Sequence, residues 1–329
     1  MQTETDLVTG PAPHWHEGVS IIDAMQDVLL ALIPITITGI LIFGTGALLV
    51  IITCVTGAVL GEIVARRFKG EQTNLGDGTA VVTGLLLALT LPPTAWWAVV
   101  PLYTLGGFLS VAIFREAMGG LGRNRFNPAL MGRVFLLFGR TTLVYLAPYL
   151  IDFNPAFTPW LEELEVVDVM AKATPLLRVV EGMELPSYST LLAIYEGGSP
   201  AETSALAVIL GIIYLIYRGR ISWRIPITTV TGVFLLSLFL GQDPLFQVLS
   251  GGLLFGVGFM ATDWVTRPVT DTGKIIYGLG IAVLVVFFRQ FIAELWIGYG
   301  GVAFSILIMN GFVRYIDKLT ARRVYGQKK

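Results

Sequence analysis

The sequence has 329 residues, of which 54% are hydrophobic and only 14% are charged. Soluble globular proteins carry about 25% charged residues, so this chain has too little polar surface to stay in water as a globular protein. Its formal net charge of −1 gives no electrostatic reason to expect a nucleic-acid partner. The composition therefore predicts a membrane protein.

Residues that could bind a metal are scarce. The single cysteine, Cys54, lies in an apolar run and has no partner for an intrachain disulfide. The two histidines, His14 and His16, lie in the polar N-terminal segment, where we expect them to be solvated. The sequence contains no Cys/His cluster with the spacing of a zinc or iron–sulfur site. We therefore expect no metal centre in this chain.

Apolar runs that suit a bilayer recur along the whole chain. A helix that crosses a hydrocarbon core of ~30 Å needs about 20 apolar residues. We predict about ten transmembrane helices, at Asp27–Phe43, Ala47–Ala65, Thr79–Leu91, Trp96–Phe114, Asn127–Phe138, Thr203–Tyr217, Ile225–Leu240, Phe246–Thr262, Ile275–Phe288 and Val302–Ile316. The third run is short and ends in prolines, so we expect it to be re-entrant or tilted. The predicted class is an all-α polytopic membrane protein.

One polar segment interrupts this pattern. Residues 150–201 are rich in acidic side chains and contain several prolines, and loops of this length are usually functional or disordered. We therefore divide the chain into an N-terminal tail, a first membrane half, a polar loop, a second membrane half and a basic C-terminal tail, at residues 1–26, 27–149, 150–201, 202–317 and 318–329.

The positions of Lys and Arg predict the orientation of the chain. With about ten spans, most of the 22 cationic residues fall on one side of the membrane, including Arg66, Arg67 and Lys69. The positive-inside rule places that side in the cytoplasm. We therefore expect both termini in the cytoplasm and the polar loop outside.

The two halves share a pattern of interrupted helices. Asp77-Gly78-Thr79 begins a short helix that ends in prolines, and Ser250-Gly251-Gly252 begins a glycine-rich helix that ends near Asp263. The first helices of the two halves would run through the bilayer in opposite directions. The pattern therefore predicts two inverted five-helix repeats with broken helices.

Three acidic residues at the ends of runs are candidates for an ion or coupling site, namely Asp77, Glu202 and Asp263. Carboxylates at the membrane are costly and often mark ion or proton routes. Asp77 and Glu202 could instead cap helix N-termini. Glu62 is expected to form an i,i+4 ion pair with Arg66. The residues alone support a transporter-like membrane protein, and a stand-alone secondary transporter is one alternative.

Several long strings resemble a known family. They are Asp77–Leu89, Leu91-Pro92-Pro93, Gly119–Gly122, Phe126–Leu130, Glu202–Leu206, Ile221–Pro226 and Phe259–Asp263. On these strings the chain resembles the D-type membrane component of the Rnf ion-translocating electron-transport complexes and, more distantly, the B-type component of the sodium-pumping NADH:quinone reductase (the NqrB/RnfD family). The resemblance implies a subunit of a redox-driven Na⁺ or H⁺ translocase, linked to ferredoxin and NAD, in the inner membrane of a bacterium or archaeon. It also implies flavin and iron–sulfur subunits as partners.

The resemblance further implies a covalent flavin. Family members carry FMN joined through its phosphate to a threonine by a flavin transferase. Asp168, Ala173 and Thr174 match the flavinylation motif, whereas Ala171 and Lys172 stand where the family usually has Ser or Thr and Gly. We therefore expect FMN at Thr174, with a non-flavinylated structural subunit as an alternative. The resemblance leaves room for a second, non-covalent flavin such as riboflavin between the helices.

Overall fold

The computed structural model describes residues 20–71, 75–93, 100–139, 175–176, 185–195, 197–291 and 301–321. Within these ranges all regular structure is helical and no strand occurs. The predicted all-α class is thereby confirmed. Three of the described helices are long and apolar enough to cross a membrane, namely Ile21–Phe43, Thr45–Phe68 and Asp271–Phe291.

The described part of the first half supplies two long helices, two short helices and one helix that ends in a π-helical turn. Its elements are α1 (Ile21–Phe43), α2 (Thr45–Phe68), the 3-10 turn η1 (Leu75–Asp77), α3 (Thr79–Leu89), α4 (Val100–Val111), the π-helical turn η3 (Ala112–Ala117) and a further helix, Pro128–Gly139. The predicted shortness of the third run is confirmed, since α3 has only 11 residues.

The rest of the chain comprises the described part of the polar loop, with α8 and the start of η5, and the second half. Its elements are α8 (Tyr188–Ala193), the 3-10 turn η5 (Pro200–Glu202), α9 (Ala205–Tyr217), α10 (Arg224–Phe239), α11 (Pro244–Leu249), α12 (Leu253–Phe255), the π-helical turn η6 (Gly256–Met260), α13 (Asp271–Phe291) and α14 (Gly301–Thr320). The apolar run Phe246–Thr262 is interrupted where the glycine-rich helix was predicted to begin, at Ser250-Gly251-Gly252. Gly251 and Gly252 have φ of 65° and 64° and break it between α11 and α12.

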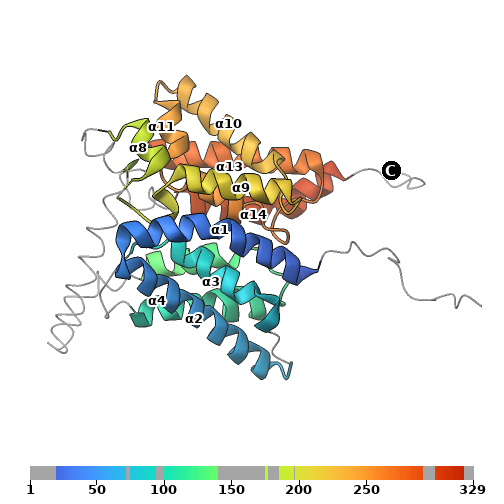
Figure 1. The fold of residues 1–329 in the computed structure, drawn as a ribbon. Helices are drawn as coiled ribbons and strands as arrows, with labels where there is room; N and C mark the ends of the chain where they lie inside the picture. Colours follow the sequence, from blue (N-terminus) through green and yellow to red (C-terminus); the bar gives the residue numbers. More distant parts are fainter. Residues whose placement is uncertain are drawn as a thin grey trace, which may run out of the picture.

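The helices of the two halves form two groups that meet where α1 lies along α9 (Figure 1). Small residues allow this close approach. A Cβ atom on Gly211 of α9 would lie 2.6 Å from the carbonyl oxygen of Ala31 on α1, and a Cβ on Gly39 would lie 2.7 Å from Cβ of Pro200. The boundary between the halves is therefore a tightly packed helix contact.

Helix α1 begins earlier than the predicted start at Asp27. Ser20 and Asp23 form a capping box, in which the Ser20 hydroxyl accepts from the Asp23 amide at 3.1 Å and Asp23 accepts from the Ser20 amide at 3.0 Å. This reciprocal pair satisfies two orphan N–H groups and extends the helix back to Ile21. At the other end Gly44, with φ of 57°, makes the predicted turn into α2.

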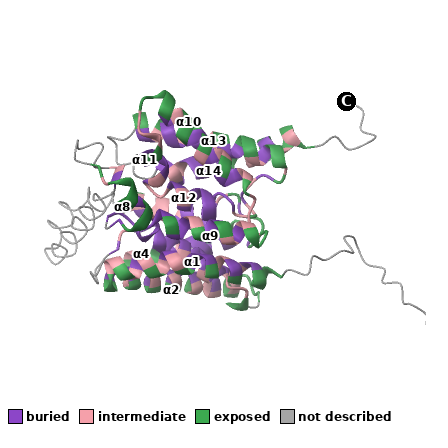
Figure 2. Cartoon of the chain, turned by 45° about the horizontal axis from the view of Figure 1, so that its top comes forward, coloured by how far each residue is buried: buried purple, intermediate pink, exposed green. Residues whose placement is uncertain are grey.

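Exposed residues lie on the outer faces of both groups and buried residues lie between the helices (Figure 2), and many of the exposed residues are large and apolar. Leu41, Tyr217 and Phe239 are 77%, 85% and 88% exposed. Apolar surface of this extent is costly in water and favourable in lipid. The burial pattern therefore agrees with a helical membrane protein.

Candidate functional site

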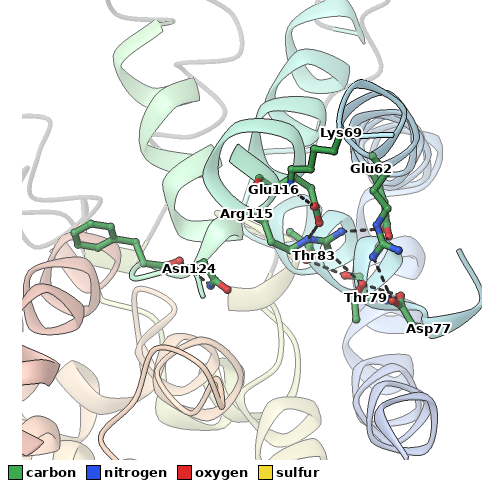
Figure 3. Close-up of polar contacts among 10 residues, drawn as sticks. Glu62, Lys69, Asp77, Thr79, Thr83, Arg115, Glu116 and Asn124 are labelled. Carbon is green, nitrogen blue, oxygen red and sulfur yellow. Dashed lines mark hydrogen bonds and ion pairs between the residues drawn. The ribbon is translucent and has the colours of Figure 1, made fainter. Parts of the chain in front are cut away.

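A buried ion network joins α2, α3 and η3 (Figure 3). Glu62 lies 2.6 Å from the Arg66 guanidinium and 3.0 Å from the Arg115 guanidinium, so the predicted Glu62–Arg66 ion pair is confirmed and gains a third member. Glu116 pairs with Lys69 at 2.9 Å and with Arg115 at 3.1 Å. The Glu62 oxygens are fully buried and lack the angular geometry of hydrogen bonds, so electrostatic attraction holds them.

Asp77 sits at the edge of this network and caps α3. Its carboxylate accepts from the Thr79 amide at 2.9 Å and from the Thr79 hydroxyl at 2.7 Å, and it lies 3.6 Å from Arg66. Arg115 donates to the same hydroxyl at 3.1 Å. Asp77 precedes the N-cap residue Gly78 and accepts from the first amide of α3, which agrees with the capping alternative, and the beginning of α3 is fixed to the network through Thr79.

The network lies on a π-helical turn, which is uncommon. Arg115 and Glu116 are adjacent residues of η3, yet both side chains reach into the same cluster. π-turns inside α-helices often mark functional sites. The three acids and three bases of the network, Glu62, Asp77, Glu116, Arg66, Lys69 and Arg115, balance in charge. The charges of the network therefore compensate one another, and its members Arg115 and the bonded Thr79 form one wall of a cavity.

A cavity of about 310 Å³ lies beside this wall, between the two halves. The interrupted helices of both halves line it, with Thr79 and Thr83 from α3 and Gly258 from η6. Asp263 also lines it, immediately after η6. The walls are mainly apolar, with a few polar side chains, which is the usual composition of a site for a small organic ligand.

The polar groups of the cavity include asparagines, threonines, two arginines and Asp263. Asn127 lines the cavity, caps the helix Pro128–Gly139 by accepting from the Ala129 amide at 3.0 Å, and donates to the Met260 carbonyl of η6 at 3.2 Å. Asp263 accepts from the Thr266 hydroxyl at 3.0 Å. These contacts fix the polar edge of the cavity across elements that are far apart in the sequence.

Asp27 fixes the wall formed by α1 and α9. This buried carboxylate accepts from the Tyr214 hydroxyl at 2.8 Å, from Arg220 at 2.6 Å and from Arg218 at 3.1 Å. The Asp27 hydrogen bond also raises the pKa of Arg218, which follows the end of α9. Sequence reasoning overlooked Asp27, although an acid within an apolar run is a signal that could have identified it.

Glu202 lies apart from this cavity, against the start of α12. A Cβ atom on Gly252 would be 3.4 Å from its Oε1, whereas Asp263 follows the other end of the α12–η6 segment. The Glu202 carboxylate is surrounded by protein, and its Oε2 has no hydrogen-bond partner among the described residues. The charges of Arg133 and Arg289 act on this carboxylate. Of the three acidic candidates, the structure therefore brings Asp77 and Asp263 close to one cavity and leaves Glu202 outside it.

The predicted flavin-attachment residues Asp168, Ala173 and Thr174 lie outside the described residues. The structure does describe the next two residues, Pro175 and Leu176. Pro175 is buried, and the Leu176 side chain packs in a small apolar cluster with residues of α8 and α11. The chain that follows Thr174 is thus anchored at the end of the bundle where α8 and α11 lie (Figure 1).

Comparisons with known proteins agree over nearly the whole chain. A sequence model of the NQR2, RnfD, RnfE family matches residues 8–326. The chain is 36% identical over 335 residues to the D component of the Na⁺-translocating ferredoxin:NAD⁺ oxidoreductase complex of Acetobacterium woodii, covering 99% of this chain and 97% of that relative. It is 36% identical over 343 residues to the D component of the proton-translocating complex of Clostridium ljungdahlii, covering 97% and 96%. The D component of an ion-translocating oxidoreductase complex of Methanosarcina acetivorans is 31% identical over 325 residues, covering 98% of each chain.

Proposed function

Because the chain belongs to the NQR2, RnfD, RnfE family, we propose that it is the D-type membrane subunit of an ion-translocating ferredoxin:NAD⁺ oxidoreductase complex. Its partners would be the other subunits, including those that carry flavin and iron–sulfur groups. Of two relatives that are each 36% identical to this chain, one belongs to a complex named as Na⁺-translocating and the other to a complex named as proton-translocating. The proposed activity is therefore redox-driven ion translocation, with either ion as the one transported.

One observation of the structure carries this proposal. The interrupted helices α3 and α12–η6 border the same cavity, between the two halves of the chain. A broken helix survives in a membrane only where protein or water covers its free backbone groups, and transporters place their ion sites at such breaks. The cavity is the place where movement of one half against the other would open a path for an ion.

The proposed arrangement is that of about ten spans in two inverted repeats, in the inner membrane of a bacterium or archaeon. Matching features support it. Gly78 and Gly252 both have positive φ, of 72° and 64°, at the start of a short helix. Glycines bring α2 close to α4 and α10 close to α13. The start of α1 and the end of α14 lie on one side of the bundle, opposite α8 and α11 (Figure 1). We assign that side to the cytoplasm and the polar loop to the outside.

We also propose that a flavin transferase attaches FMN to Thr174. The anchored Pro175 and Leu176 support this, because they hold the residues directly after Thr174 against α8 and α11. Arg289 lies at the same place, which suits a phosphoryl group. A bound flavin would supply one-electron transfer, and the chain would supply its position and its electrostatic surroundings.

A second flavin without a covalent bond, such as riboflavin, fits the cavity between the halves. A volume of about 310 Å³ is within the range of small-molecule sites. The apolar side chains Val82 and Leu86 of α3 suit a flat ring system. Asn124 and Thr262 present hydrogen-bonding groups to its polar edge.

The proposal is tested on the purified complex. After denaturation, the subunit should fluoresce in a gel, and its mass should exceed that of the bare chain by one FMN less one water. Both signals should vanish in Thr174→Ala. An unmodified subunit in a complex that still pumps would instead establish the non-flavinylated structural subunit. A chain that purifies without partners and transports ions without redox substrates would establish the stand-alone transporter.

A further inference from the structure

A single buried carboxylate joins the two halves of the chain beside the larger cavity. Asp27 of α1 accepts hydrogen bonds from three side chains of the second half, which are Tyr214, Arg218 and Arg220. These four residues form the Asp27 cluster. Hydrogen bonds to an ionised group are roughly twice as strong as those between neutral groups. The Asp27 cluster therefore attaches α1 firmly to the end of α9 and the turn that follows it.

The turn that carries the two arginines has a fixed backbone. It is a Schellman motif around Gly219, which has φ of 68° and separates the arginines. The Gly219 amide donates at 2.9 Å to Ile216, and the next amide donates at 2.8 Å to Leu215, both of them backbone carbonyls of α9. Because these bonds hold the turn to its own helix, α1 can move away from the turn only when the hydrogen bonds to Asp27 break.

The cavity between the halves reaches the protein surface close to this cluster. Three of the residues that line it are exposed, namely Ile21, Leu121 and Trp264, at 50%, 41% and 45%. Ile21 begins α1 in the first half, and Trp264 follows η6 in the second half. The entrance of the cavity therefore lies between the two halves, at the end of the bundle where α1 begins (Figure 1).

Arg220 connects the Asp27 cluster to this entrance. Its side chain lines the cavity and donates to the Asp27 carboxylate at 2.6 Å. Its backbone carbonyl accepts a hydrogen bond from the indole N–H of Trp264. One residue thus contacts α1 of the first half and the segment after η6 of the second half, and both of these border the cavity.

We propose that the Asp27–Arg220 ion pair is a gate that controls access to the cavity from the side where α1 begins. This inference rests on the proposed movement of one half of the chain against the other. While the pair is formed, α1 lies against the turn after α9 and the entrance stays narrow. When the pair breaks, the halves separate at this end, and water and ions reach the cavity from that side. Rigid-body movement of two halves around a central site alternates access in this way.

The test measures how fast a water-soluble maleimide reaches the cavity. The full-length chain is placed in lipid nanodiscs and dialysed to remove non-covalent ligands, and Thr83→Cys supplies a thiol on the α3 wall of the cavity. The labelling rate follows the fraction of open molecules. Asp27→Asn keeps the shape of the side chain but removes its charge, so it should raise the labelling rate by roughly tenfold or more. Arg224→Gln is the matched control and should leave the rate unchanged, because Arg224 pairs with Asp271 inside the second half, at 3.0 Å.

The native cysteine separates opening of the gate from unfolding. Cys54 is the single cysteine of the chain and is buried on α2 within the first half. In chains without the Thr83→Cys reporter, Cys54 should stay unlabelled with or without Asp27→Asn. Labelling of Cys54 as fast as that of the reporter would mean that the first half unfolds, and it would overturn the gate. Equal labelling of the reporter with Asp27 and with Asn at this position would overturn it as well.

A milder variant keeps the test decisive if Asp27→Asn does not fold. Tyr214→Phe removes one of the three hydrogen bonds to Asp27 and leaves both arginines in place. It should raise the labelling rate of the Thr83→Cys reporter by a smaller factor than the loss of the charge. An unchanged rate in Tyr214→Phe would count against the gate.

The labelling requires neither redox partners nor a transported ion. A complex without redox-driven ion translocation, built with a chain whose labelling depends on Asp27, would refute the proposed function and leave the gate. Labelling that is independent of Asp27, in a complex that still translocates ions, would refute the gate and leave the proposed function.

Discussion

Replacing Arg115 with methionine should destabilise the protein through the ion network. Arg115 is 2% exposed, and its guanidinium contacts Glu62 at 3.0 Å, Glu116 at 3.1 Å and the Thr79 hydroxyl at 3.1 Å. Methionine keeps much of the apolar length but removes the charge and all five donors. Two buried carboxylates would each lose one of their cationic partners.

The expected loss of unfolding free energy depends on the ion pairs that remain in Arg115→Met. Removing one partner of a buried ion pair costs about 3–5 kcal/mol. Glu62 keeps Arg66 at 2.6 Å and Glu116 keeps Lys69 at 2.9 Å, so we expect the lower end, about 3 kcal/mol. An unfolding entropy of about 2.1 cal/mol/K per residue gives roughly 0.7 kcal/mol/K for this chain, and a fall in Tm of about 4 °C.

Differential scanning fluorimetry of the detergent-solubilised protein measures this change. Arg67→Met is the matched control, because Arg67 is exposed on the same helix as Arg66 and its replacement should leave Tm nearly unchanged. The double variant Glu62→Gln with Arg115→Met should recover part of the loss, since both charges are removed together. If Tm of Arg115→Met matched that of the Arg67 control, the network would be solvated and the reasoning wrong.

Three further predictions concern the helix packing and the cavity. Gly107→Ala should destabilise the α2–α4 contact, because its Cβ would lie 2.2 Å from the Cys54 carbonyl oxygen, whereas Gly139→Ala has open space and should be tolerated in the same unfolding assay. Desolvation raises the pKa of Asp263, so the folded state holds this proton more tightly than the unfolded state does. Stability should therefore fall as the pH rises from about 4, and Asp263→Asn should flatten that slope in Tm measured against pH. Thr83→Phe should fill the cavity and abolish extractable non-covalent flavin while covalent flavin persists; retention of the extractable flavin would place it elsewhere.

Local sequence signals predicted the helices well, because each depends on neighbouring residues. The turn at Gly44, the short α3 and the Glu62–Arg66 pair all follow from spacings within one or two helical turns. The early start of α1 also depends on neighbouring residues, because Ser20 and Asp23 form its capping box. These polar residues lie outside the apolar run that was used to predict the helix. Apolar periodicity therefore located the membrane helices and missed the cap that begins one of them.

Contacts between distant residues could not be predicted in this way. Arg115 reaches Thr79 across 36 positions, and Asn127 reaches the Met260 carbonyl across 133. The sequence marks Thr79, Arg115 and Asn127 as polar, but only the arrangement of the helices in space brings these three side chains to one cavity. The break at Gly251 and Gly252 was read correctly as a glycine-rich start, yet the run before it was apolar enough to look continuous.

The three acidic candidates differ in the charged groups that surround them, and this difference assigns them different roles. Asp77 caps α3 and lies 3.6 Å from Arg66, so its charge is already used. Two arginines, Arg133 and Arg289, act on Glu202, so among the described residues its charge is already compensated. Asp263 also has an arginine nearby, but it alone of the three borders the larger cavity. An ion that moves between the halves would therefore meet Asp263, whereas Glu202 is held by the charges of Arg133 and Arg289.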